Sequence, residues 1–319
     1  MIVTLTANPS HDRTVVLNEA LRPGEVQRAA GTTNQAGGKG TNISRGCLAA
    51  GVPTTAVVPA TEDDPYVREL VTAGMRCRAV PHPGSLRVNF TLTDPEGTTT
   101  KINTPGPEIT GPVRDAVAAA LLSEATEADW VVLAGSLPPG IEPGWYAELV
   151  AALGDTGAKV AVDTSDAPLR ALVDRLGTAA PHLLKPNGEE LASLTGADPD
   201  AVEADPLVAA AAAQRLVDSG VEAVLATLGG NGAVLVTADG AWLATPPPTT
   251  VVSTVGAGDS SLCGYLLADL RGESPGVRLA HAVAYGSAAA SLPGTTIPAP
   301  DQTRPDLVDV RAITPVPAT

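Results

Sequence analysis

The chain has 319 residues, and 44% of them are hydrophobic, which excludes an intrinsically disordered protein and allows a large buried core. Its 35 acidic and 20 basic residues give a net charge of −15, so long-range repulsion opposes binding to nucleic acid or to an anionic membrane surface. A small anionic substrate is compatible with this charge, because it needs only a few local cations and backbone N–H groups.

The sequence shows no signal for export or membrane insertion. The first residues contain neither a basic region nor a long apolar run, and nowhere do 18 apolar residues follow one another. The three cysteines, Cys47, Cys77 and Cys263, are odd in number and far apart, which indicates reduced thiols rather than a disulfide framework. We therefore expect a cytoplasmic protein without membrane contacts.

The first part of the chain alternates between strand-like and helix-like segments. Residues 2–7 are predicted to form a strand, and residues 40–50 a helix that follows a Gly-Gly-Lys-Gly segment. Further strands are predicted at residues 54–58, 130–134, 159–163, 182–185 and 223–227. Helices are predicted at residues 66–73, 113–125, 144–153, 167–175, 189–194 and 207–219. This alternation indicates right-handed crossovers and an α/β fold with a mostly parallel sheet covered on both faces.

Four short, half-polar segments without intervening helices interrupt this alternation, at residues 14–17, 25–29, 88–93 and 99–102. The last two are joined by an Asp-Pro-Glu-Gly turn, which is typical of a hairpin. We expect these strands to pair with one another as a small separate sheet. This sheet would be a lid, formed by insertions at about residues 12–30 and 86–104 of a single domain that spans residues 1–319.

The last third of the chain begins with a predicted meander of strands at residues 232–237, 241–244 and 250–253. Two Ala-rich helices are predicted after it, at residues 257–270 and 276–291. From about residue 298 the chain is rich in proline, and we expect an irregular tail.

The segment with the most chemical information is Gly256-Ala257-Gly258-Asp259, at a predicted strand-to-helix junction. Glycines beside a small residue at a helix start let consecutive backbone N–H groups point at an anion, assisted by the helix dipole. A carboxylate in the first helical turn is a suitable general base for a hydroxyl group. Phosphoryl transfer to an alcohol requires this pair. The dinucleotide and Walker motifs do not fit, because Ser261 and Thr33 stand where glycines are needed.

This segment resembles the C-terminal signature of the PfkB/ribokinase family of sugar kinases, and Gly37-Gly38-Lys39-Gly40-Thr41-Asn42 resembles its N-terminal signature. Further family-like segments lie between them in the family's order, at residues 135–140, 163–165, 185–190 and 227–229. The likeness spans about residues 1–298, and the start of the chain resembles the phosphosugar-kinase branch. The resemblance implies a ribokinase-like three-layer α/β/α fold with a small β-sheet lid, and an ATP-dependent kinase.

The resemblance also implies roles at the nucleotide end of the site. The expected catalytic residues are Asp259 as the general base and Gly256, Ala257 and Gly258 as the anion hole. Asn187 and Glu190 match the family's Asn-x-x-Glu motif, which positions Mg²⁺ near the phosphates. The residues expected to bind ATP are Lys185, Asn187, Thr227, Gly229 and Gly232. The potassium site of the family maps to the backbone near Ser253, Val255 and Gly294.

For the acceptor, the resemblance implies binding by Asp12, Gly37, Gly38, Lys39, Asn42, Arg87, Asn103 and Ser136. A lysine at a helix start, such as Lys39, suits a substrate that already carries a phosphate. Arg87 matches the position that holds this phosphate in phosphofructokinases of the family. Two residues depart from the family pattern. His11 stands where an apolar residue is usual, and Asp166 stands where glycine commonly follows Asp-Thr-Ser.

The leading expectation is phosphorylation of D-fructose 1-phosphate at its 6-hydroxyl group, which gives fructose 1,6-bisphosphate. Tagatose-6-phosphate kinase and 6-phosphofructokinase of the same family remain alternatives, because the sequence does not fix which hydroxyl group faces Asp259. A non-catalytic sugar-phosphate sensor is disfavoured by the intact Gly-Ala-Gly-Asp segment, and an NAD-dependent oxidoreductase by the missing dinucleotide fingerprint. The exposed edges of the small sheet predict a homodimer joined through it.

Overall fold

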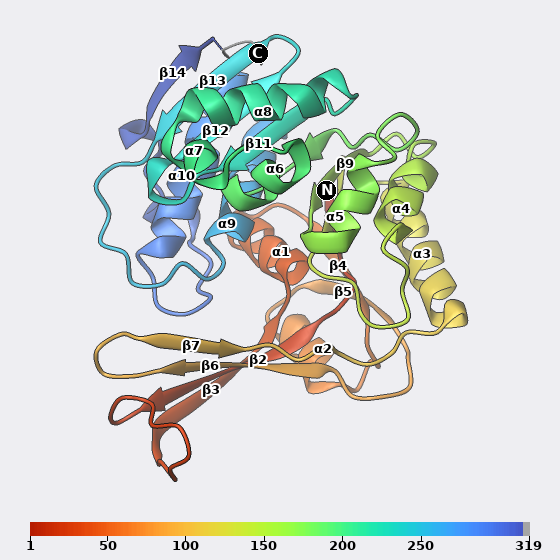
Figure 1. Cartoon of the computed structure of the whole chain (residues 1–319). Coiled ribbons are helices and arrows are strands. Elements are labelled where there is room, and N and C mark those ends of the chain that lie inside the picture. Colours follow the sequence, from red (N-terminus) through yellow and green to blue (C-terminus); the bar gives the residue numbers. More distant parts are fainter. Residues whose placement is uncertain (315–319) are drawn as a thin grey trace.

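A mostly parallel sheet forms the centre of the computed structural model, which describes residues 1–314 (Figure 1). Within that range ten strands join in this sheet. Across the sheet they are β14 (Asp309–Ile313), β13 (Gly240–Thr245), β12 (Ala233–Thr237), β11 (Ala223–Thr227), β10 (Leu183–Leu184), β9 (Lys159–Asp163), β8 (Trp130–Ala134), β1 (Ile2–Thr6), β4 (Thr54–Pro59) and β5 (Arg76–Val80). The strands from β11 to β5 are parallel, and β12, β13 and β14 add antiparallel pairs at one edge.

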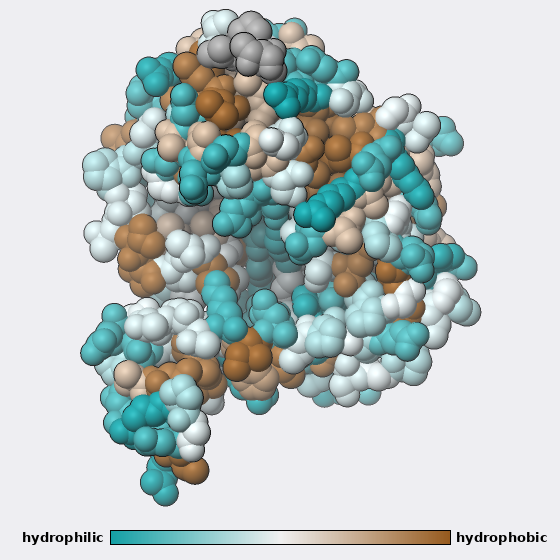
Figure 2. Space-filling model, in the orientation of Figure 1, coloured by the Kyte–Doolittle hydropathy of each residue, from teal (hydrophilic) through white to brown (hydrophobic). Residues whose placement is uncertain are grey.

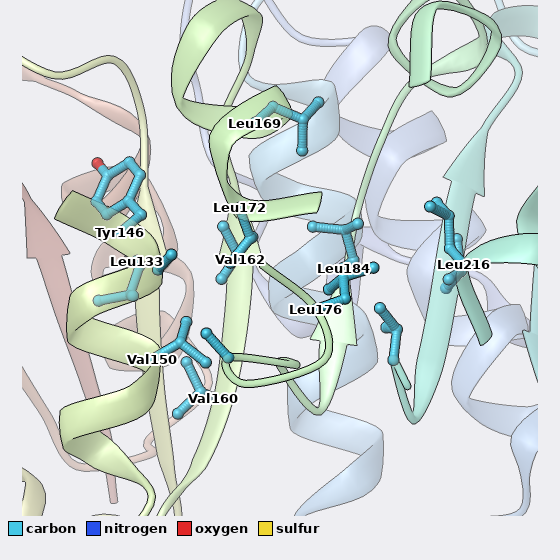
Figure 3. Close-up of a cluster of buried hydrophobic side chains, with 14 of the residues drawn as sticks. Leu133, Tyr146, Val150, Val160, Val162, Leu169, Leu172, Leu176, Leu184 and Leu216 are labelled. Atoms are coloured by element: carbon cyan, nitrogen blue, oxygen red, sulfur yellow. The ribbon is translucent and has the colours of Figure 1, made fainter. Parts of the chain in front are cut away.

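Helices cover both faces of the sheet and make three layers. They are α1 (Lys39–Ala49), α2 (Pro65–Thr72), α3 (Gly111–Ala125), α4 (Trp145–Leu153), α5 (Asp166–Val173), α6 (Gly188–Thr195), α7 (Pro199–Ala204), α8 (Pro206–Asp218), α9 (Ala257–Asp269) and α10 (Pro275–Ala290). One core lies under α3 to α8, and a second lies under α1, α9 and α10. Figure 3 shows part of the first core, in which apolar side chains of β8 and β9 meet those of α4 and α5.

The sequence of β1 shows why the sheet needs both layers. All five of its residues are buried; Val3 and Leu5 contribute to the first core, and Ile2 to the second. A strand with apolar side chains on both faces is stable only when helices cover both of them. The predicted α/β class, with a mostly parallel sheet, is therefore confirmed.

A second sheet of four strands projects from the main body at the bottom of Figure 1. Its strands, in order across the sheet, are β3 (Ala29–Gly37), β2 (Ser10–Leu17), β6 (Arg87–Thr93) and β7 (Thr99–Ile102). The β2–β6 pair is parallel, whereas the β2–β3 and β6–β7 pairs are antiparallel. Most side chains of these strands are at least partly exposed, which explains the half-polar sequences. We call these four strands the small sheet.

Three sequence-based predictions of elements were wrong. The strand predicted at residues 25–29 does not form, since the chain turns at Gly24 and the strand begins only at residue 29. No strand forms at residues 250–253, because β12 and β14 already pair with the two edges of β13. The tail from residue 298 is not wholly irregular, since β14 belongs to the main sheet. Strand β5 and helix α7 were not predicted.

Other structural findings concern the cysteines and the length of the helices. Cys47, Cys77 and Cys263 are free thiols, and two of them, Cys47 and Cys263, are buried. Among residues 1–314, no helix combines the length and the apolar character that a membrane crossing requires.

Candidate active site

A cavity of about 1030 Å³ lies between the carboxyl ends of the parallel strands and the small sheet. Figure 2 shows hydrophilic side chains gathered in the hollow between these two parts. The cavity is lined by Asp12, Gly38, Lys39, Asn42, Arg87, Asn103, Ser136, Lys185, Asn187, Glu190, Thr227, Gly229, Gly232, Gly256, Ala257, Gly258 and Asp259. Ligands of open α/β sheets bind at this end of the strands. One cleft thus brings together the predicted site residues except Gly37, which lies behind Asp12.

Asp259 lies in the first turn of α9, deep in this cavity. Gly256 begins the turn with φ +79°, a backbone conformation that favours glycine. The Asp259 carboxylate is only 6% exposed, and its Oδ2 accepts a hydrogen bond of 2.8 Å from Nδ2 of Asn42. Burial raises the pKa of Asp259 to about 6, although the nearby charge of Lys39 and the Asn42 bond partly oppose this effect. Such a carboxylate can accept a proton at neutral pH.

The start of α1 forms another wall of the cavity and depends on closely packed glycines. Gly38 has φ +119°, and a methyl group there would overlap the side chain of Thr6. At Gly37 a methyl group would overlap the carboxylate of Asp12. The missing side chain at Gly38 leaves room for Thr6 at the end of β1, and that at Gly37 leaves room for Asp12 of the small sheet.

Asp163, the last residue of β9, is a cavity residue that the sequence analysis did not select. It is fully buried, and its two oxygens lie 2.7 Å from Nζ of Lys39 and 3.1 Å from Nζ of Lys185. Burial alone would raise its pKa, but the two ammonium groups outweigh burial and lower it. An acidic residue that ends a buried strand, close to a lysine that ends the next one, was the signal that could have identified it.

At the small-sheet end of the cavity, a hydrogen-bond network fixes Asp12 in place. Its Oδ1 accepts a hydrogen bond of 2.7 Å from Ser10 Oγ and one of 3.1 Å from Nδ2 of Asn89. Ser10 and Asn89 also line the cavity and were not predicted. These bonds leave Oδ2 of Asp12 for another partner.

Arg87, at the same end, is held by backbone carbonyl groups. Its guanidinium donates hydrogen bonds to the oxygens of Asn8 (2.9 Å) and Thr104 (3.1 Å), and its Nε is buried without a partner. Burial lowers the pKa of Arg87, and the negative charge of Asp12 opposes this effect. Ser136 lies near Arg87, since both line a second cavity of about 350 Å³ next to the first. A partly buried cation with an unused donor favours an anionic ligand.

The opposite end of the cavity is formed by α6 and the loop after β11. Asn187 and Glu190 bond reciprocally at the start of α6: Asn187 Oδ1 accepts from Glu190 N at 2.7 Å, and Glu190 Oε2 accepts from Asn187 N at 2.9 Å. A bridge joins Asn187 to Thr227, where the glycine-rich loop begins. In that loop Gly232 has φ +94°, and a methyl group there would overlap the carbonyl oxygen of Ala244.

The residues at this end fit a divalent metal that is held mainly through phosphates and water. Burial raises the pKa of Glu190, which indicates a carboxylate that a cation would stabilise. Within residues 1–314 no group of three or more His, Cys, Asp or Glu side chains could form a complete metal site. Proteins usually bind Mg²⁺ through only one or two carboxylates, and the phosphates of the substrate supply further ligands.

The two residues that depart from the family pattern have local structural explanations. His11 does not line the cavity; its Nε2 lies 3.2 Å from Oδ1 of Asp64, the residue that caps α2. Asp166 has φ +55°, and among the described residues no other non-glycine residue has a positive φ. The left-handed backbone explains why glycine suits this position.

A carboxylate at a glycine-opened helix start, in a cleft with lysines at its centre and an arginine at one end, defines an enzyme that transfers a phosphoryl group to a small acceptor. The sequence matches the pfkB family of carbohydrate kinases over residues 8–302. The chain therefore belongs to this family, and it is an ATP-dependent kinase whose reaction requires a divalent metal. This confirms the family and the kinase activity that the sequence predicted.

Particular relatives show the same relationship. The chain is 34% identical over 305 residues to a 1-phosphofructokinase of Rhodobacter capsulatus, with 94% of each chain covered. It is 33% identical over 303 residues to the 1-phosphofructokinase of Escherichia coli K12, with 92% of this chain and 93% of that one covered. The structure of E. coli phosphofructokinase-2 in complex with substrates and products gives a TM-score of 0.86 at 29% identity, over 95% of this chain and 97% of that chain.

Proposed function

We propose that the protein transfers the γ-phosphoryl group of ATP to the 6-hydroxyl group of D-fructose 1-phosphate and thereby forms fructose 1,6-bisphosphate. The observation that carries this proposal is the position of Asp259 in the middle of one cavity. The glycine-rich nucleotide end lies on one side of it, and the end with Arg87 and Ser136 lies on the other. Relatives named 1-phosphofructokinase support the choice of acceptor.

In this reaction Asp259 is the general base. It takes the proton from the acceptor hydroxyl group as the oxygen attacks the γ-phosphorus. The backbone N–H groups of Gly256, Ala257 and Gly258 open helix α9 and stabilise the negative charge of the group in transfer. Asn42 orients the carboxylate through its 2.8 Å hydrogen bond.

The acceptor lies across the start of α1, at the junction with the small sheet. Asp12 accepts hydrogen bonds from the sugar hydroxyl groups through the oxygen that its own network leaves free. Asn103 contacts the sugar from the small sheet, and the close packing at Gly37 and Gly38 holds Asp12 in position. Arg87 binds the 1-phosphate, because its buried Nε has no other partner.

At the nucleotide end, Thr227, Gly229 and Gly232 bind ATP, and Lys185 contacts its phosphates. Asn187 and Glu190 would hold Mg²⁺, and the metal when bound would neutralise charge on the phosphates. Potassium binds to backbone carbonyls near Ser253, Val255 and Gly294. The hydrogen bond of 3.0 Å from Ser253 Oγ to the oxygen of Gly294 supports this site, because it holds the two segments together.

The small sheet is proposed to act as a lid and as a dimer interface. Closing the cavity would keep water away from the γ-phosphoryl group. Its outer strands β3 and β7 have an unpaired edge, and Val16, Val26 and Ile102 are exposed by 43%, 95% and 51%. Edges and apolar side chains of this kind are usually covered by a partner, so we propose a cytoplasmic homodimer. Light scattering at the assay concentration tests it, and a monomer contradicts it.

Initial rates with three acceptors test the proposed substrate. ADP release is measured with Mg²⁺ and ATP at equal concentrations of fructose 1-phosphate, tagatose 6-phosphate and fructose 6-phosphate. The proposal predicts the highest kcat/KM for fructose 1-phosphate. A higher value for either of the other two acceptors would replace the proposed substrate, and no turnover with any of them would favour a sensor.

A further inference from the structure

A series of hydrogen-bonded side chains connects the centre of the cleft to the edge of the small sheet. It begins at Asn42, whose Nδ2 donates the 2.8 Å hydrogen bond to Asp259. Oδ1 of the same amide accepts a longer hydrogen bond, of 3.4 Å, from Nη1 of Arg45. Nη2 of Arg45 donates to Oε1 of Glu69 at 2.7 Å, and Oε2 of Glu69 accepts from the backbone N–H of Ala36 at 2.8 Å. Three side chains therefore connect the carboxylate to strand β3.

The positions of these residues in the fold explain the series. Asn42 and Arg45 are three residues apart in α1, so they lie on the same face of that helix. Ala36 belongs to β3, which is an outermost strand of the small sheet, and its N–H group finds its partner outside the sheet. Glu69 of α2 is that partner, and its second oxygen remains available for Arg45.

Arg45 determines which end of the Asn42 amide faces Asp259. A guanidinium group only donates hydrogen bonds, so Oδ1 of Asn42 faces Arg45 and Nδ2 faces the carboxylate. In this orientation the amide stabilises the ionised carboxylate, which is the form that accepts a proton. If the amide turned over, its oxygen would accept a hydrogen bond from the protonated carboxyl group and would stabilise the inactive form instead.

The contacts of Arg45 indicate that it acts on Asp259 through Asn42 and not by its own charge. Its side chain is 15% exposed, and its charge is balanced by the carboxylate of Glu69. The strongest charge effects on the Asp259 carboxylate come from three other groups, which are Lys39, Asp163 and Lys185. None of these three groups changes when Arg45 is replaced.

We propose that Arg45 and Glu69 are positioning residues for the transfer reaction. Arg45 fixes the Asn42 amide so that it donates to the general base, and Glu69 holds both Arg45 and strand β3. That strand ends at Gly37, against which the carboxylate of Asp12 packs, so Glu69 also supports the wall of the acceptor site. The inference rests on the proposed general base and adds two residues that do not touch the substrate.

The pKa of Asp259 tests the inference without any substrate. Protein labelled with ¹³C at the aspartate carboxyl carbons is titrated by NMR around pH 6, and the signal that Asp259→Asn lacks belongs to the base. Arg45→Met should raise this pKa by about half a unit or more. In the Asn42→Leu background the same substitution should leave the pKa unchanged, because no amide remains to be oriented. Arg68→Met removes an exposed arginine of α2 next to Glu69, and it is the matched control that should not move the pKa.

Kinetics and a second variant supply further measurements. In Arg45→Met the fall in kcat at low pH should move upward with the pKa, and the KM for fructose 1-phosphate should change less than about twofold. Glu69→Ala leaves Arg45 in place and alters a side chain that is 41% exposed, so it decides the question if Arg45→Met does not fold. It should raise the pKa of Asp259 and also raise that KM about threefold, because β3 loses its bond to α2.

The possible outcomes separate the inference from the proposed substrate. An unchanged pKa in both Arg45→Met and Glu69→Ala would overturn the inference, and a loss of stability alone would not move the pKa. An equal rise with and without Asn42 would also overturn it, since Arg45 would then act through space. A rise in Arg45→Met alone would support Arg45 and refute the role of Glu69. If none of the three acceptors is phosphorylated, the proposed substrate fails and the NMR titration still decides.

Discussion

Replacement of Asp259 by asparagine should stop turnover and make the fold more stable. Burial raises the pKa of this carboxyl group in the folded state to about 6, against an ordinary value of 3.8, so its ionised form is destabilised. Such a group contributes stability below the unfolded pKa and loses that contribution as the pH rises through about 6. Two pKa units correspond to about 3 kcal/mol at pH 8. Asparagine carries no charge, so Asp259→Asn should unfold with a free energy about 3 kcal/mol higher than that of the wild type at this pH.

Thermal denaturation at two pH values measures this difference. For 319 residues the entropy of unfolding is about 0.7 kcal/mol per kelvin, so about 3 kcal/mol corresponds to a rise in Tm of about 4 °C at pH 8. At pH 5 the wild-type carboxyl group is protonated in the folded state, and the gain should shrink to about half. The asparagine oxygen can still accept the hydrogen bond of Asn42, so packing at the site stays the same.

Asp163→Asn is the matched control, because it also neutralises a buried aspartate and should have the opposite effect. The pKa of Asp163 is lowered by Lys185 and Lys39 in spite of burial, so its stabilising contribution is present above the unfolded pKa and is lost as the pH falls. Breaking this buried cluster should reduce the unfolding free energy by at least about 3 kcal/mol at pH 8. If Asp259→Asn unfolds at or below the wild-type Tm at pH 8, burial does not destabilise the Asp259 carboxylate and the reasoning is refuted.

Three more predictions concern single residues. The kcat of the wild type should fall as the pH drops through about 6. Asn42→Leu should move this fall in kcat to about pH 7, because the substitution removes a hydrogen bond that lowers the pKa of Asp259. A pH–rate profile that does not move contradicts this prediction. Asp166→Gly should be about 1 kcal/mol more stable than Asp166→Ala in urea denaturation, since both remove the charge and only alanine is strained at φ +55°; equal stabilities speak against strain there. Gly37→Ala should raise the KM for the sugar phosphate about tenfold and leave the KM for ATP unchanged, because the new methyl group displaces Asp12; the opposite pattern of KM values would place Asp12 at the nucleotide end.

The sequence was sufficient to predict the layers of the fold because its signals are local. Strand β1 is apolar on both faces, and the parallel strands β4, β8, β9 and β10 are each followed by a helix. Strand β14 was missed because its pairing with β13 depends on a contact with a segment about 70 residues away in the sequence, and the proline-rich stretch before it indicated an irregular tail.

At the site, too, features with a local sequence signal were predicted and features that depend on long-range contacts were missed. Glycine-rich turns and the carboxylate that follows them are contiguous in the sequence, and they were recognised. Asp163 was not selected, because its importance comes from Lys39, which is 124 residues away in the chain. Asn89 was overlooked for a similar reason: it lies in a half-polar strand, and only the pairing of β6 with β2 brings it to Asp12. These contacts depend on pairing between segments that are far apart in the sequence, and a local sequence pattern does not predict such pairing.

The hydrogen bond between Asn42 and Asp259 joins residues that are 217 positions apart. A contact of this span forms late in folding, because a long loop must close before it can contribute stability. During renaturation from urea, helical circular dichroism should therefore recover before enzymatic turnover. A fragment that stops short of α9 would lose this contact together with α9 and α10, which cover the second core, so we expect that its sheet would not stay folded.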